Sequence, residues 1–155
     1  MAVEVERKFL VVNDSWRDAA TGVLFRQGYL CTEPERTVRV RLAGERGKLT
    51  IKGKAVGISR AEYEYPIPAA EAVELLDNLC LRPLIEKTRY RIEYAGRLWE
   101  VDEFHGVNAG LLLAEIELET EDQAFALPDW AGKEVSDDPR YYNSNLVREP
   151  FKNWR

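Results

Sequence analysis

The chain of 155 residues is poor in the side chains on which much enzyme chemistry depends: it has one histidine, two cysteines and one methionine. Because His105 is the sole histidine, zinc chemistry and Ser-His-Asp catalysis are nearly excluded, the second surviving only if this residue served it. Cys31 and Cys80 are too few for a disulfide framework and lack the spacing of a metal site. A bound metal would therefore be a hard cation such as magnesium, manganese or calcium.

Long apolar runs are also lacking. No stretch approaches the roughly 18 apolar residues that a membrane helix needs, and charges stand where a signal peptide would be hydrophobic. We therefore expect no membrane association and a reducing, cytoplasmic environment. The net charge of −5 argues against a nucleic-acid partner. The length predicts a single domain over residues 1–155.

What the chain has instead is period-two alternation of charged and apolar residues, which is typical of β-strands. Helical patterns interrupt the alternation only at 69–80 and 139–148. Eight short antiparallel strands predict a mainly β (α+β) protein, built as a closed barrel or a sandwich with a few helices. The expected strands lie at 2–12, 22–31, 36–43, 48–54, 59–67, 84–94, 97–104 and 110–119.

Charged residues occupy alternate positions in seven of the eight predicted strands, and after the first strand each row carries one sign. The first strand places Glu4 and Glu6 on one face with Lys8. The later rows are Arg39/Arg41, Lys52/Lys54, Glu62/Glu64, Lys87/Arg89/Arg91, Glu100/Asp102 and Glu115/Glu117/Glu119.

These rows have two interpretations. In the first, the charges face water around an apolar core, as in most half-buried strands. In the second, the charges line the interior and the apolar residues lie outside. Rows of one sign suit an interior in which acids hold a cation and bases hold an anion. Dense positive charge in an enclosed space calls for a highly charged anion, such as polyphosphate or a nucleoside triphosphate. The pattern alone leaves both interpretations open.

The opening Glu4-Val-Glu6-Arg-Lys8 resembles the ExExK signature of the CYTH-domain proteins, the triphosphate tunnel metalloenzymes. Similar segments follow in the family's order across nearly the whole chain. They are Arg39-Val-Arg41, Thr50-Ile-Lys52-Gly-Lys54, Glu62-Tyr-Glu64, Lys87-Thr-Arg89, Ala114-Glu115-Ile-Glu117-Leu118 and Asp138-Pro-Arg140-Tyr141-Tyr142-Asn143-Ser144. The resemblance implies an eight-stranded antiparallel tunnel with a charged interior, and apolar faces covered by helices or by a partner subunit in a homodimer.

The resemblance also implies roles for the charged residues. The expected ligands of Mg²⁺ or Mn²⁺ are Glu4, Glu6, Glu115 and Glu117. The expected catalytic residues are Lys8, Lys87 and Glu117. The expected substrate-binding residues are Lys8, Arg39, Arg41, Lys52, Lys54, Lys87, Arg89, Tyr29 and Arg140, and the further tunnel acids are Glu62, Glu64 and Asp102. Ordinary packing is the alternative for Tyr29 and Arg140, and a solvated position is the alternative for Arg91 and Glu119. Glu100 is expected to be structural.

Short members of this family resemble inorganic triphosphatases. The implied activity is metal-dependent hydrolysis of tripolyphosphate to pyrophosphate and phosphate. Three alternatives use the same basic rows: a thiamine-triphosphatase, a class IV adenylate cyclase, and a non-catalytic module that binds polyphosphate or nucleotides. The sequence does not assign a general base.

Overall fold

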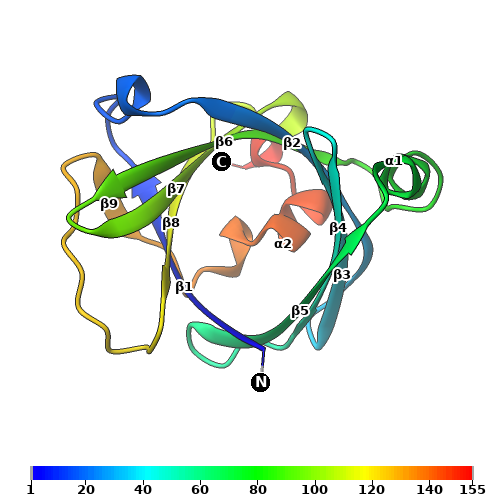
Figure 1. Ribbon diagram of the computed structural model, residues 1–155, viewed down its shortest axis with the longest axis horizontal. Helices are drawn as coiled ribbons and strands as arrows, with labels where there is room; N and C mark the ends of the chain where they lie inside the picture. Colours follow the sequence, from blue (N-terminus) through cyan, green and yellow to red (C-terminus); the bar gives the residue numbers. More distant parts are fainter. Residues whose placement is uncertain (1, 155) are drawn as a thin grey trace.

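The computed structural model describes residues 2–154, and its strands form a closed antiparallel barrel. The ring consists, in spatial order, of β1 (Val3–Val11), β5 (Ser59–Ile67), β4 (Arg46–Gly53), β3 (Arg36–Ala43), β2 (Gly22–Glu33), β6 (Ile85–Tyr94), β7 (Arg97–Phe104) and β8 (Leu112–Leu118). The ring closes because β1 pairs with β5 on one side and with β8 on the other. Figure 1 looks along this ring, which confirms the predicted barrel and excludes the sandwich.

One strand was not predicted, and one predicted helix is interrupted. A short strand, β9 (Ala131–Glu134), pairs with β1 and was not predicted, because its four residues show no alternation. The helix expected over 139–148 is broken into a 3₁₀ turn, η3 (Pro139–Tyr141), and the helix α2 (Asn143–Arg148). The break lies at Tyr142, whose backbone is extended (φ −70°, ψ 132°).

The remaining helical segments are α1 (Ala69–Asn78) and three 3₁₀ turns, η1 (Arg17–Ala19), η2 (Gly106–Asn108) and η4 (Phe151–Asn153). The predicted first helix is thus confirmed, two residues shorter at its end. No helix within residues 2–154 combines the length and the apolar character needed to cross a membrane.

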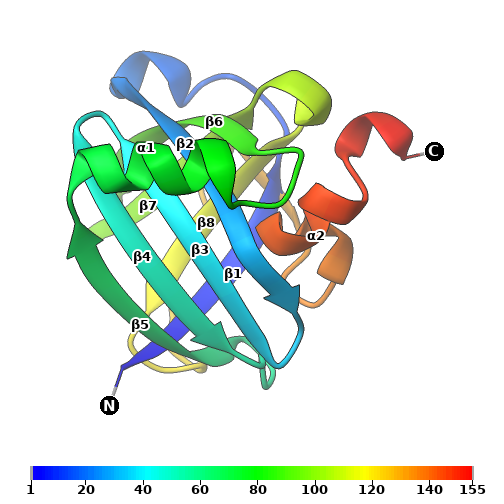
Figure 2. The same cartoon turned by 90° about the vertical axis from the view of Figure 1, so that its right-hand side faces the viewer.

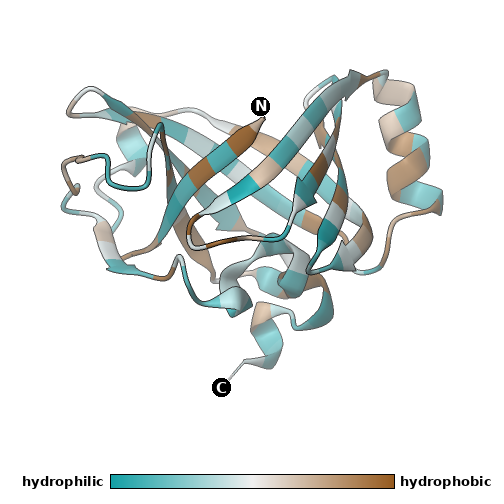
Figure 3. Cartoon of the chain, turned by 90° about the horizontal axis from the view of Figure 1, so that it is seen from below, coloured by the Kyte–Doolittle hydropathy of each residue, from teal (hydrophilic) through white to brown (hydrophobic). Residues whose placement is uncertain are grey.

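The apolar strand faces lie on the outside of the barrel, beneath other segments. Ala72 and Leu76 of α1 are fully buried on Val40 of β3, and Figure 2 shows α1 lying across the strands β2 to β4. A second cluster gathers around Trp99 of β7 and includes Trp130, just before β9. Figure 3 shows the alternation of hydrophilic and hydrophobic residues along the strands that results from this arrangement.

Gly28 allows the segment after α1 to lie directly on β2. A Cβ atom at this glycine would lie 2.7 Å from Cβ of Cys80 and 2.7 Å from Cδ2 of Leu84, well inside van der Waals contact. The N–H of Leu81 donates to the carbonyl of Tyr29 at the same place (2.8 Å). A side chain at position 28 would therefore prevent this close approach.

The C-terminal segment covers one end of the barrel. Leu146 and Val147 of α2 are buried against an apolar floor made by strand residues, namely Tyr29, Ile85, Phe104 and Leu113. Arg148 fastens the helix by donating from Nη2 to the carbonyl of Thr32 (2.9 Å). Figure 1 shows α2 within the outline of the ring. The charged part of the interior therefore lies between this floor and the other end.

Candidate active site

The charged rows surround a cavity of about 250 Å³ inside the barrel. The interpretation that places the charges inside is thus confirmed. The predicted site residues that line this cavity are Glu4, Glu6, Lys8, Tyr29, Arg39, Arg41, Lys52, Glu62, Glu64, Lys87, Arg89, Glu115 and Glu117. Asp102 is fully buried and bonded to two of these bases.

Two predicted substrate-binding residues are not brought to the cavity. Lys54 is exposed, because β4 ends at Gly53 and the strand alternation ends with it. The Arg140 side chain is 62% exposed and donates to Asp138 (2.8 Å). Glu100, expected to be structural, lines the cavity and accepts from Arg89 Nη1 (3.3 Å).

Asp102 organises the basic wall of the cavity. Its carboxylate accepts hydrogen bonds from Arg89 Nε (2.7 Å) and Nη2 (2.8 Å) and from Lys87 Nζ (2.7 Å). Burial alone would raise the pKa of Asp102, but the positive charges of Arg89 and Lys87 outweigh it and the pKa is lowered. Burial lowers the pKa of Lys87 to about 7; Asp102 opposes this shift, while Arg89 and Arg41 add to it. Burial is therefore the main cause of the shift at Lys87, and the neighbouring guanidinium groups add to it.

The arginines of β3 lack a full set of partners within the described chain. Nε of Arg39 is buried and has no hydrogen-bond partner among residues 2–154. Burial, together with the charges of Arg39 and Arg89, lowers the pKa of Arg41 to about 9. The Phe25 ring contacts the guanidinium groups of Arg41 on β3 and Arg89 on β6, with centroid distances of 4.7 Å and 5.1 Å. An anion in the cavity would satisfy the buried donor and relieve this repulsion.

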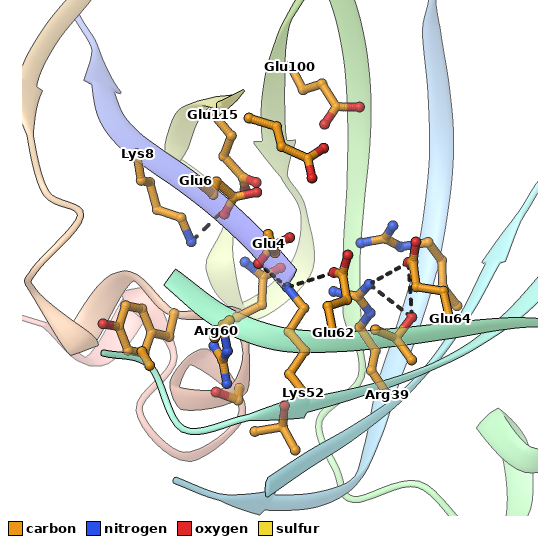
Figure 4. A pocket seen from close by; sticks show the side chains of 18 of the residues that line it. Glu4, Glu6, Lys8, Arg39, Lys52, Arg60, Glu62, Glu64, Glu100 and Glu115 are labelled. Carbon is orange, nitrogen blue, oxygen red and sulfur yellow. Dashed lines mark hydrogen bonds and ion pairs between the residues drawn. The ribbon is translucent and has the colours of Figure 1, made fainter. Parts of the chain in front are cut away.

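Figure 4 shows that the acidic side chains of the cavity lie among further bases, including Lys8, Arg39 and Lys52. Lys52 Nζ lies 2.9 Å from Oε1 of Glu4 and 3.4 Å from Oε2 of Glu62. Burial, with the negative charge of Glu4, raises the pKa of Glu62 to about 7. Burial also raises the pKa of Glu6 well above its ordinary value, and the carboxylates of Glu115 and Glu4 add to the effect.

We tested whether these carboxylates suit a divalent cation. Residues 2–154 contain no group of three or more His, Cys, Asp or Glu side chains already placed to hold a metal ion. One physical reason is that the ammonium of Lys52 lies between Glu4 and Glu62. The repulsion that raises the pKa of Glu6 is nevertheless what a hard cation would relieve, and its ligands would be carboxylate oxygens. The chemistry of the donor set therefore fits such a cation.

Several residues of the barrel interior were not predicted; most of them are neutral, but the charged Lys48 and Arg60 also line the cavity. Phe25 and Gln27 of β2 precede Tyr29 by four and two residues, so the strand alternation could have placed both inside. Asn143 and Ser144 line the cavity from α2. No periodic pattern marks these two residues, because they enter from the segment that covers the barrel end.

A comparison with known proteins agrees with this geometry. The family described as CYTH domain matches residues 2–142. Over 155 residues the chain is 53% identical to a protein of Acetivibrio thermocellus named inorganic triphosphatase, covering 100% of this chain and 99% of that protein. It is 40% identical over 149 residues to a protein of the same name from Nitrosomonas europaea, covering 93% of this chain and 96% of the other.

Solved structures agree as well. The crystal structure of the inorganic triphosphatase NE1496 matches with a TM-score of 0.66 at 37% identity, covering 95% of each chain. The family implies a divalent metal cofactor. With a barrel, a charged cavity and a matching profile over nearly its whole length, the chain belongs to the CYTH-domain family.

Proposed function

We propose that this chain hydrolyses inorganic tripolyphosphate to pyrophosphate and phosphate inside the barrel. The observation that carries the proposal is the cluster of basic side chains inside the barrel, above all the unpartnered Nε of Arg39 within residues 2–154. A small, highly charged anion is the ligand that best balances such a wall. The two relatives named inorganic triphosphatase support the choice of substrate.

The basic residues that line the cavity would bind the phosphate oxygens. Arginine can contact phosphate with two parallel hydrogen bonds, whereas lysine acts as a point charge. The proposed contacts are Lys8, Arg39, Arg41, Lys52, Lys87 and Arg89, with Tyr29 beside them at the floor. Lys54 and Arg140 are omitted because both are exposed.

Glu4, Glu6, Glu115 and Glu117 would hold Mg²⁺ or Mn²⁺. When bound, such a cation supplies charge neutralisation to the phosphate oxygens in a loose phosphoryl-transfer transition state. Lys8 and Lys87 would stabilise the charge that develops on the leaving phosphate. The tunnel acids Glu62, Glu64 and Asp102 would orient the basic side chains, as Asp102 does for Arg89.

The test is an activity panel in Mg²⁺ or Mn²⁺. Tripolyphosphate, pyrophosphate, ATP and thiamine triphosphate are supplied separately, and the release of phosphate, pyrophosphate and cyclic AMP is measured. We expect the highest kcat/KM for tripolyphosphate, and a loss of about 10²-fold or more in the Glu6→Gln and Lys87→Ala variants.

A matched control for these variants is Glu103→Gln. Glu103 lies beside Asp102 on β7, pairs with Arg17 and is not one of the cavity-lining residues. If kcat/KM were higher for ATP or thiamine triphosphate than for tripolyphosphate, that compound would be the preferred substrate instead. Turnover of none of the four compounds by the folded protein would leave only a binding role.

A further inference from the structure

The segment that covers the barrel end reaches into the cavity through Asn143, the first residue of α2. Its Oδ1 accepts hydrogen bonds from Lys87 Nζ (2.9 Å) and from Gln27 Nε2 (2.8 Å). Gln27 Oε1 in turn accepts from Nε of Arg41 (3.0 Å). A single neutral side chain is thus connected to a base on β6 and, through one amide, to a base on β3.

The charges at the two ends of this chain of hydrogen bonds determine how both amides are turned. An ammonium and a guanidinium only donate hydrogen bonds. The oxygen of Asn143 must therefore face Lys87, and the oxygen of Gln27 must face Arg41. The nitrogen of Gln27 is then turned toward the Asn143 oxygen. Turning either amide over would set two donors against each other.

Both acceptors are neutral, which matters for anion binding. A carboxylate in either place would form an ion pair with its base and compete with a phosphate oxygen for the same charge. An amide oxygen orients the base and leaves its full charge in place. Protonated Lys87 has three N–H donors; among residues 2–154, Asp102 and Asn143 take two of them, so one remains for an oxygen in the cavity.

Packing of the C-terminal segment determines where Asn143 lies. Leu146 of the same helix is fully buried in the floor. On the other side, the carbonyl of Tyr141 accepts from Lys8 Nζ (3.1 Å). The covering segment therefore contacts a third cavity base and is anchored both before and after Asn143.

We propose that Asn143 is a positioning residue of the triphosphate site. Its neutral oxygen holds Lys87 directly, and Arg41 through Gln27, in the orientation that binds phosphate oxygens. The inference rests on the proposed function for the identity of the ligand. It requires that a negative charge at position 143 harm binding more than removal of the side chain does.

The test measures binding of tripolyphosphate by calorimetry in EDTA, because chelation stops turnover and leaves the basic residues to bind the anion. The variants are Asn143→Asp and Asn143→Ala, with Asn145→Asp as the matched control. Asn145 lies on the same helix, donates to the carbonyl of Pro139 (2.7 Å) and is not one of the cavity-lining residues.

We expect Asn143→Asp to raise Kd on the order of tenfold to a hundredfold, because the new carboxylate would take from the phosphate about one hydrogen bond to a charged base. Asn143→Ala should raise Kd less. Asn145→Asp should change Kd less than about twofold, because a charge outside the cavity is screened. With metal present, Asn143→Asp should raise KM more than it lowers kcat. A purely structural defect would instead lower kcat by reducing the folded fraction.

Should Asn143→Asp fail to fold, Gln27→Glu introduces the same charge beside Arg41 from within β2, with the same expected loss. Unchanged Kd in the folded variants would overturn the proposal, and so would an equal loss in Asn145→Asp. Wild-type protein that binds tripolyphosphate but does not cleave it with metal would refute the proposed function alone. Wild-type protein that neither binds tripolyphosphate in EDTA nor cleaves it with metal would refute both.

Discussion

The Asp102 carboxylate and the Arg89 guanidinium form a bidentate pair inside the barrel, with N–O distances of 2.7 and 2.8 Å. The Asp102 side chain is fully buried and that of Arg89 is nearly so. A third hydrogen bond to the same carboxylate comes from Lys87. Asp102 therefore bonds two buried bases at once, while Glu100 and Glu115 also lie near Arg89.

Removal of this acid should be costly. We expect Asp102→Asn to lower the free energy of unfolding by about 3–5 kcal/mol, because it leaves uncompensated buried charge. Urea denaturation measures the change. Glu103→Gln, the next residue on the same strand, removes an exposed ion pair with Arg17 and should cost less than about 1 kcal/mol. Equal costs for the two variants would contradict this view of Asp102.

Lys87 should take up a proton when an anion binds. Its pKa of about 7 leaves it mostly neutral at pH 8, and a bound polyanion would raise that pKa. Calorimetry of tripolyphosphate binding at pH 8, in buffers that differ in ionisation enthalpy, should show uptake of about one proton per site. In Lys87→Arg the uptake should fall nearly to zero. Equal uptake in both proteins would assign the proton to another group.

Glu62 should make the metal-free protein more stable as the pH falls toward its ordinary pKa. Because its folded pKa of about 7 exceeds the ordinary 4.5, the folded protein binds more protons than the unfolded chain between these values. Stability from this group therefore rises as the pH falls from 7 to 4.5. Other carboxylates act in the opposite direction, so the comparison must be between wild type and Glu62→Gln in urea titrations with EDTA. The difference between the two should shrink at low pH, and a constant difference would contradict the assignment.

Gly28→Ala should destabilise the protein. The added methyl group would overlap Cys80 and Leu84 at 2.7 Å, and overpacking of this kind costs about 1–3 kcal/mol. Gly53→Ala is the control, because the nearest atom there, Cβ of Ala61, is 3.4 Å away. Thermal unfolding of both variants measures the effect. If Gly28→Ala lowered Tm no more than Gly53→Ala, the segment after α1 would be able to move away from β2 at little cost.

Much of the fold follows from alternation along the strands. The alternation marks a segment as a strand, and it also divides the residues of that strand between the two faces of the barrel wall. Alternation placed Arg39 and Glu115 in charged rows, and the resemblance to the family then assigned both rows to one cavity. Alternation loses its meaning where a strand ends, as at Lys54. It also gives no information about Asn143, whose place depends on how a terminal segment packs across the barrel.

The apolar floor formed with α2 makes the two ends of the cavity different. Exposed cavity residues such as Arg91, whose side chain is 68% exposed, lie toward the opposite end. Under the proposed function, substrate would enter and products would leave by one shared route, so a product must depart before the next substrate arrives. Under the same proposal, a longer polyphosphate would be inserted by its terminus, and cleavage would be confined to chain ends.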